Sequence, residues 1–110
     1  GHGMYLRVNG QAIWARGANV IPMDNMEGRL SLSAHIQLAR SAAAAGMNTL
    51  RVWGGGIFLP RAFYDACDDE GLLLFQDMMY AQEGHAPKET ASQEAELRHQ
   101  VRRWRGCVGR

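Results

Sequence analysis

Three short apolar runs, separated by helix-forming segments, constrain the fold of this chain more than any other feature. The runs are Arg16–Val20, Met47–Trp53 and Leu72–Phe75. They show almost no polar alternation, as is typical of parallel strands covered on both faces. An alanine-rich helix pattern over 32–45 follows the first run, and a second one over 60–70 follows the next. This alternation predicts parallel β/α units.

The segments on either side complete the expected order of elements. Before the first run, Met4–Val8 and Ala12–Arg16 flank Asn9-Gly10, which is the strongest short signal for a β-hairpin. After the third run, a helix pattern extends from Ser92 to Arg105. The order is hairpin, β, α, β, α, β, α. A doubly wound sheet and part of a (β/α)8 barrel both fit this order, and 110 residues are too few for a whole barrel of about 250 residues.

The first helix carries clear end signals. Ser31 is a good N-cap and Gly46 is a good left-handed C-terminal residue. The expected buried face consists of Leu32, Ile36, Ala39 and Ala43, with His35 and Arg40 outside it. In the second helix, Pro60 is expected at the first helical position.

Composition excludes several classes of function. The net charge of +1 and the single basic helix near residue 100 give no nucleic-acid footprint, and no apolar run is long enough to span a membrane. We find no signal peptide and no pattern that fixes the localisation. Two separated cysteines, Cys67 and Cys107, make neither a metal site nor a disulfide framework. The four histidines share no metal-binding spacing, no catalytic constellation is recognisable, and we expect no cofactor.

The residues at the ends of the three strands are the candidate binding site. Working groups in parallel β/α folds cluster past the carboxyl ends of the strands, and those positions hold Asn19, Trp53 and Asp77. An amide, an indole and a carboxylate together suit a neutral polyhydroxylated ligand. Gly54-Gly55-Gly56 follows Trp53 without the spacing of a dinucleotide-binding loop, so it indicates close backbone approach instead.

Each of these residues also has a structural interpretation. Trp53 could be an ordinary core side chain. Asn19 could satisfy local backbone groups. Asp77 could cap a helix or pair with an arginine. The sequence pattern by itself leaves these alternatives open.

The chain resembles the β-mannosidases of glycoside hydrolase family 2 from about Tyr5 to Trp104. The resemblance rests on a set of short motifs: Val8-Asn9-Gly10, Gly17-Ala18-Asn19, Met47-Asn48 through Gly56, Phe63-Tyr64-Asp65, Gly71-Leu72 and Gln76-Asp77. It implies a retaining exo-glycosidase that removes terminal β-D-mannose from oligosaccharides or glycoprotein glycans by means of two glutamates. In that family, the position of Trp53 helps to wall the mannose subsite.

The resemblance also implies how the chain is divided. Residues 1–14 would end a β-sandwich domain, 15–105 would form the first three units of a barrel, and 106–110 depart from the family pattern. The chain begins without Met, and we expect it to be a fragment. Neither catalytic glutamate has a counterpart here, so we expect no catalytic residue and no activity of the isolated chain. The alternative is a non-catalytic module that binds sugar or complements the missing remainder of a barrel.

Overall fold

The computed structural model describes residues 5–81 and 90–105 of the chain. The expected divergent tail at 106–110, with Cys107, lies outside the described residues, as do His2 and His85. Within the described ranges, the molecule has a two-stranded hairpin, a three-stranded sheet and three α-helices.

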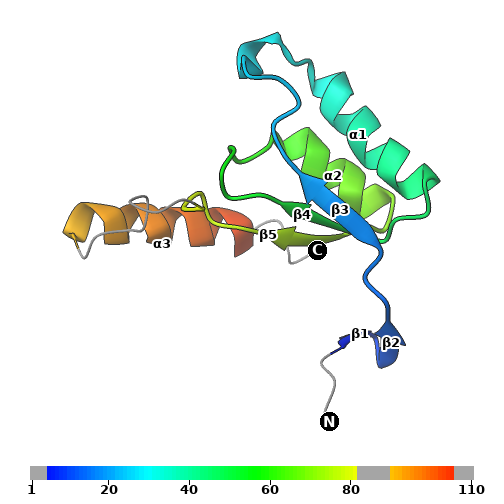
Figure 1. The fold of residues 1–110 in the computed structure, drawn as a ribbon. Helices are drawn as coiled ribbons and strands as arrows, with labels where there is room; N and C mark the ends of the chain where they lie inside the picture. The colour runs from blue at the N-terminus through cyan, green and yellow to red at the C-terminus, as the bar shows by residue number, and fades with distance from the viewer. Residues whose placement is uncertain (1–4, 82–89, 106–110) are drawn as a thin grey trace.

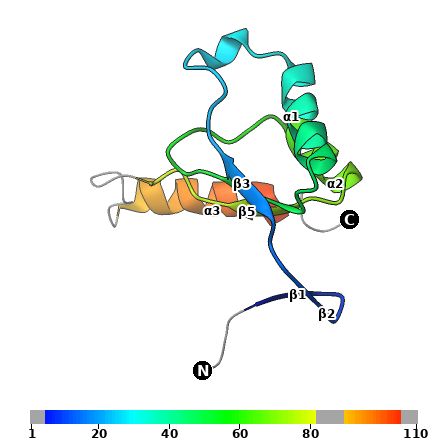
Figure 2. The same ribbon diagram turned by 45° about the vertical axis from the view of Figure 1, so that its right-hand side comes forward.

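The N-terminal hairpin confirms the Asn-Gly signal. Strands β1 (Leu6–Val8) and β2 (Gln11–Ile13) pair antiparallel, with Val8 opposite Gln11. Asn9 and Gly10 have φ values of 47° and 80°, as a type I′ turn requires of both central residues. Both strands are shorter than predicted, and Figure 2 shows that the hairpin projects away from the rest of the chain.

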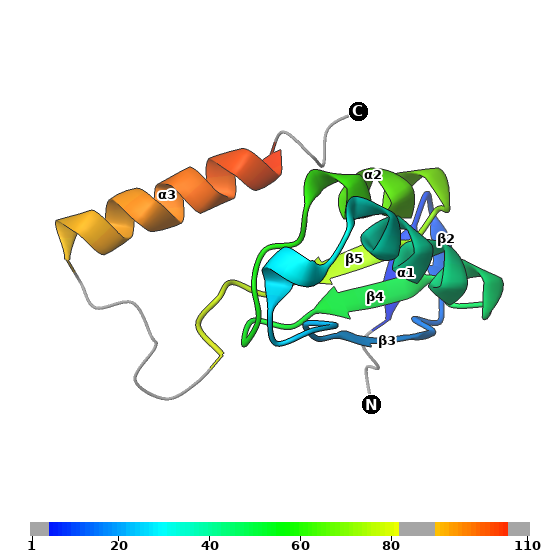
Figure 3. The same ribbon diagram turned by 90° about the horizontal axis from the view of Figure 1, so that it is seen from above.

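The central sheet confirms the parallel β/α arrangement. Its strands β3 (Gly17–Val20), β4 (Thr49–Val52) and β5 (Leu73–Gln76) are all parallel and lie in sequence order. Helices α1 (Leu32–Ala44) and α2 (Arg61–Asp69) cross between successive strands and cover the same face of the sheet (Figures 1 and 3). The chain is therefore a mixed α/β protein.

The core lies between this face of the sheet and the two helices. Leu50 and Val52 of β4 point into it, and Phe63 and Cys67 of α2 are fully buried there. The ring of Phe63 meets that of Tyr64 edge-on at 83°, with a centroid distance of 5.4 Å. These contacts pack the covered face of β4 closely against α2.

The opposite face of the sheet is open among the described residues, so the expectation of strands covered on both faces is wrong for β5. Leu73 and Phe75 point away from the helices, and the side chain of Phe75 is 63% exposed. The apolar run in β5 had suggested double coverage because it lacks alternation. In the structure α1 and α2 both lie on one side, which leaves the other side uncovered.

Helix α1 begins as predicted, and its buried stripe agrees in part with the expected one: Ala39 is buried, and Ile36 and Ala43 pack against the core. The Ser31 hydroxyl accepts a hydrogen bond from the Ala34 N–H at 3.2 Å. The buried positions are His35, Ala39 and Ala42, whereas Leu32 is exposed. Burial of His35 is tolerated because its Nδ1 lies 3.0 Å from the carbonyl oxygen of Ser31. Since a carbonyl only accepts, Nδ1 carries the proton.

Two further boundaries differ from the sequence-based expectation. Pro60 is the N-cap of α2 rather than its first helical residue. The connection between β3 and α1 contains a 3₁₀ turn, η1 (Glu27–Arg29).

Helix α3 (Ala91–Arg105) lies apart from the sheet (Figure 3). No helix in the described part of the chain is long and apolar enough to cross a membrane.

The side chain of Asn48 joins the hairpin to the sheet. Its Oδ1 accepts from the Arg16 N–H at 2.8 Å, and its Nδ2 donates to the Trp14 carbonyl at 3.0 Å. The Arg16 carbonyl in turn accepts from the N–H groups of Asn48 and Thr49 at 2.9 and 3.1 Å. One amide side chain therefore holds the segment that links β2 to β3.

Candidate functional site

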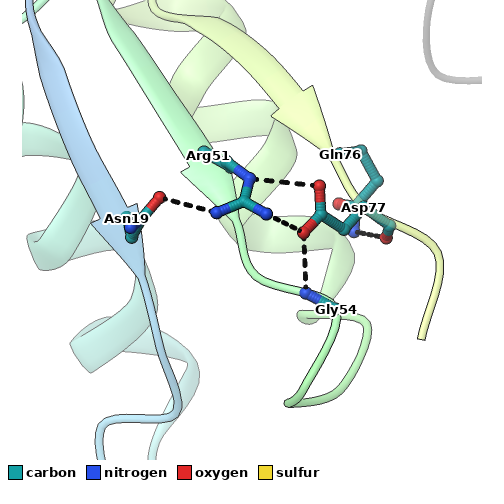
Figure 4. A network of polar contacts seen from close by, with 5 residues as sticks. All are labelled: Asn19, Arg51, Gly54, Gln76 and Asp77. Atoms are coloured by element: carbon teal, nitrogen blue, oxygen red, sulfur yellow. Dashed lines mark hydrogen bonds and ion pairs between the residues drawn. The ribbon is translucent and has the colours of Figure 1, made fainter. Parts of the chain in front are cut away.

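Polar side chains gather where the three parallel strands end. The register places Asn19, Arg51 and Phe75 side by side on the open face of the sheet. Trp53 and Asp77 follow just beyond the last residues of β4 and β5. Figure 4 shows that Asn19 and Asp77 approach Arg51 from opposite sides. The three residues predicted for the site thus lie at one end of the sheet: Asn19 is the next-to-last residue of β3, and Trp53 and Asp77 directly follow β4 and β5.

Arg51 and Asp77 form a two-pronged ion pair. Arg51 Nη2 lies 2.6 Å from Asp77 Oδ2, and Arg51 Nε donates to Asp77 Oδ1 at 3.2 Å. The Gly54 N–H also donates to Oδ2, at 3.1 Å. This fork geometry matches a guanidinium to a carboxylate, and charged hydrogen bonds of this kind are the stronger ones. The structure therefore confirms the alternative in which Asp77 pairs with an arginine.

Asn19 extends this ion pair to the third strand. Its Oδ1 accepts from Arg51 Nη1 at 3.2 Å, so one guanidinium bridges the ends of β3, β4 and β5 (Figure 4). Within the described residues, Asn19 Nδ2 has no hydrogen-bond partner. A ligand hydroxyl placed there would find an amide donor that is already oriented by Arg51.

Arg51 is the site residue that sequence reasoning missed. It lies in an apolar strand, where its charge looks like an interruption, and its partners are 32 and 26 residues away. The available signal was its position in the strand, two residues before Trp53 and therefore on the same face. Its role depends on the register, which the sequence pattern did not specify.

Trp53 is half-buried, and its indole folds back against Gly55. Its backbone N–H donates to the Val20 carbonyl at 3.0 Å, so the residue still continues the sheet. The alternative that Trp53 is an ordinary core side chain is only partly correct. Its indole is half-buried, but it lies against the glycine loop after β4 and not among the core residues under the helices.

A second set of hydrogen bonds supports the end of β5 from the covered side. The Tyr64 hydroxyl donates to Gln76 Oε1 at 2.9 Å, and Gln76 Nε2 donates to the Asp77 carbonyl at 2.7 Å. The same hydroxyl accepts from the Leu59 N–H at 3.3 Å. The backbone that carries Asp77 is therefore held from both faces of the sheet.

The open face has a hollow beside this polar group. It has a volume of about 280 Å³ and is lined by Ala15, Gly17, Ala18, Asn19, Thr49 and Arg51. This is close to the lower end of small-molecule sites, about 300 Å³. A larger hollow of about 540 Å³ lies between β3 and α1, but its walls are mostly apolar. Asn19 lines both hollows, and the smaller one is the better match to a polar ligand because Arg51 lines it as well.

The described residues offer binding groups here but no obvious catalyst. Asp77 already has its charge balanced by Arg51. Burial, followed by the nearby charge of Asp68, raises the pKa of the Cys67 thiol from 9.0 to about 12, so this thiol is not a nucleophile at neutral pH. In the described ranges, no group of three His, Cys, Asp or Glu side chains is arranged to hold a metal ion.

The fold and this site define an α/β protein in which a guanidinium bridges the carboxyl ends of three parallel strands, beside a hollow on the open face of the sheet. No family model matches the chain. It is 40% identical over 101 residues to the β-mannosidase of Capra hircus and 39% identical over 105 residues to that of Mus musculus. These alignments cover 90% and 94% of the chain but only 12% of each relative.

A solved structure gives the same result. The β-D-mannosidase of Dictyoglomus thermophilum matches with a TM-score of 0.86 at 33% identity, covering 94% of this chain and 13% of that one. Fungal relatives agree: β-mannosidase B of Thermothelomyces thermophilus is 40% identical over 80 residues, which is 73% of the chain and 9% of the relative. The chain is therefore related to the β-mannosidases, which are glycosidases, and corresponds to one segment of them.

Proposed function

We propose that this chain forms the first three β/α units of the (β/α)8 catalytic barrel of a retaining exo-β-mannosidase of glycoside hydrolase family 2. In this proposal, residues 1–14 end a preceding β-sandwich, 15–105 form the barrel units and 106–110 are a divergent tail. The arrangement of the sheet supports it. Three parallel strands lie in sequence order with their helices on one face, as in a barrel wall whose open face is the interior.

The substrate proposed for the full enzyme is a terminal, non-reducing β-D-mannose residue of an oligosaccharide or a glycoprotein glycan. Trp53, Asn19 and Asp77 would line its subsite. The observation that carries this proposal is the bridging of the three strand ends by Arg51, which orients the Asn19 amide and holds the Asp77 carboxylate against the Gly54 N–H, next to Trp53 in the chain. Amide and guanidinium N–H groups bind sugar hydroxyls, and an indole face packs on sugar C–H groups.

A titration with methyl β-mannoside tests this subsite. In a chain with Trp14→Phe and Trp104→Phe, Trp53 is the only tryptophan, and its emission on selective tryptophan excitation should change saturably as the sugar is added. Asn19→Ala should weaken the response, because the oriented amide is lost. An equal response to methyl β-glucoside, or no response to either sugar, would contradict the proposed subsite.

The 110-residue polypeptide itself is proposed to be inactive. By the family resemblance, its acid/base and nucleophile glutamates would come from the fourth and seventh barrel strands, and both are needed for retention. Release of p-nitrophenol from p-nitrophenyl β-mannoside by the purified chain, above a no-protein control, would refute this.

A second candidate function, a module that complements the rest of a barrel, is favoured by the open face and edges of the sheet. Ile21 and Phe75 are 60% and 63% exposed there, which is unusual for large apolar groups in a finished fold. Mixing the chain with a β-mannosidase polypeptide that lacks the matching segment should give a stable complex on gel filtration. Independent elution of the two would exclude complementation.

A further inference from the structure

The three glycines after β4 each meet a different neighbour. A methyl group on Gly54 would overlap the Met78 carbonyl oxygen and lie 3.0 Å from Asp77 Cβ. A methyl group on Gly56 would lie 2.8 Å from Pro22 Cγ. The loop is therefore held between the segments that follow β3 and β5.

Gly55 differs because its close neighbour is the indole of Trp53. A Cβ at Gly55 would overlap Cζ2 and Cη2 of that ring and lie 2.6 Å from Cε2. Such an atom would therefore be close to three successive ring atoms at once. An approach in the plane of the ring would leave the third atom much farther away than the other two. Gly55 therefore lies under one face of the indole.

The requirement for glycine at this position comes from contact and not from backbone conformation. The glycines with positive φ in the described residues are Gly10, Gly46 and Gly71, and Gly55 is not among them. Its φ is therefore on the side that alanine also adopts. The Gly56 N–H also donates to the Trp53 carbonyl at 3.3 Å, and this turn holds Gly55 against the side chain of residue 53.

We propose that Gly55 is a positioning residue that determines which face of the Trp53 indole is presented at the strand ends. Gly55 covers one face, so only the opposite face is available for a ligand to pack on. Any side chain at position 55 pushes the indole out of this orientation, because the ring is the movable partner in the contact. The inference deepens the proposed function, in which Trp53 is the sugar-facing wall, although the orientation itself requires no sugar.

Acrylamide quenching of Trp53 tests the orientation without a ligand. The full chain with Trp14→Phe and Trp104→Phe is compared with and without Gly55→Ala. We expect the quenching constant to rise about twofold, because the displaced indole leaves its rotamer and becomes more exposed. The control is Gly28→Ala: this glycine lies in the 3₁₀ turn η1, also without positive φ, and a Cβ there meets nothing within 4 Å. Equal quenching constants in the Gly55→Ala and parent chains would overturn the proposal.

A double-mutant cycle distinguishes the contact between Gly55 and Trp53 from a general loss of stability in the Gly55→Ala variant. Gly55→Ala should lower the urea midpoint, followed by circular dichroism, when Trp53 is present and should change it little in a Trp53→Ala background. An equal loss in both backgrounds would overturn the proposal. If the indole moves as expected but methyl β-mannoside elicits no response, the positioning role stands and the proposed sugar subsite fails.

Discussion

The two faces of the three-stranded sheet differ in what holds them together. On the covered face, Leu50 and Val52 meet fully buried side chains of α2, and the contacts are almost entirely apolar. On the open face, Arg51 links the strand ends by hydrogen bonds while Phe75 remains exposed. The same β4 therefore contributes alternate residues to a core and to a polar site. The covered face stabilises the fold, and the open face positions groups that contribute little to stability.

Of the substitutions considered, loss of the Phe63 ring from the covered face should lower the free energy of unfolding most. Phe63→Ala deletes a ring with no exposed surface, and we expect a loss of about 3–5 kcal/mol in the free energy of unfolding, measured by urea denaturation. Phe63→Leu keeps most of the volume and should cost less than about 1.5 kcal/mol. A loss below about 1 kcal/mol for Phe63→Ala would show that the covered face is not the main source of stability.

The covered face should also make stability depend on pH above neutrality. The pKa of Cys67 is raised from 9.0 to about 12 in the folded chain, so the folded state holds the thiol proton more tightly than the unfolded state does. The contribution of the Cys67 thiol to the free energy of unfolding is complete below pH 9 and is lost as the pH rises from 9 towards 12. In a Cys107→Ser background, Cys67→Ala should flatten this decline in urea midpoints. Parallel pH curves for the two chains would contradict the expectation.

Neutralisation of Asp77 should have a smaller effect, because the open face is partly hydrated. The side chains of Arg51 and Asp77 are 43% and 16% exposed, so solvent screens much of their attraction. We expect Asp77→Asn to cost about 1–2 kcal/mol of unfolding free energy. A double-mutant cycle with Arg51→Met isolates the pair, and a coupling near zero would show that the bridge contributes nothing to stability.

Substitution of Phe75 should have the smallest effect on stability. Phe75→Lys replaces an exposed ring, and we expect the unfolding free energy to change by less than about 0.5 kcal/mol. Self-association should decrease, because the open face loses a large exposed apolar group. Sedimentation velocity at several concentrations measures this, with Phe75→Leu as an apolar control. Equal association of both variants would mean that another surface drives it.

Features with local causes could be predicted from the sequence. The Asn9-Gly10 turn and the Ser31 cap each depend on a few adjacent residues, and both are present in the structure. The order of strands and helices was also correct, with boundaries that shifted by one to a few residues. The likeness to β-mannosidases, inferred from short motifs, is confirmed by relatives near 40% identity.

Features that depend on packing between distant segments could not be predicted in the same way. Burial of His35 required knowing which side of α1 meets α2, and exposure of Phe75 required knowing that both helices lie on one face. The bridging role of Arg51 follows from the register of β4 against β3 and β5. Periodicity within one segment contains none of this information. Whether Trp53, Asn19 and Asp77 contact a sugar stays a prediction.

The attachment of the hairpin through Asn48 has a mechanical consequence. The hairpin shares no strand ladder with the sheet, and the Asn48 amide together with the Arg16 carbonyl ties residues 14–16 to the start of β4. A pulling force on the N-terminus would therefore load these few hydrogen bonds together before it reached the core. Such a junction acts as a pivot that yields first, and the parallel strands behind it would keep their register while the hairpin swings.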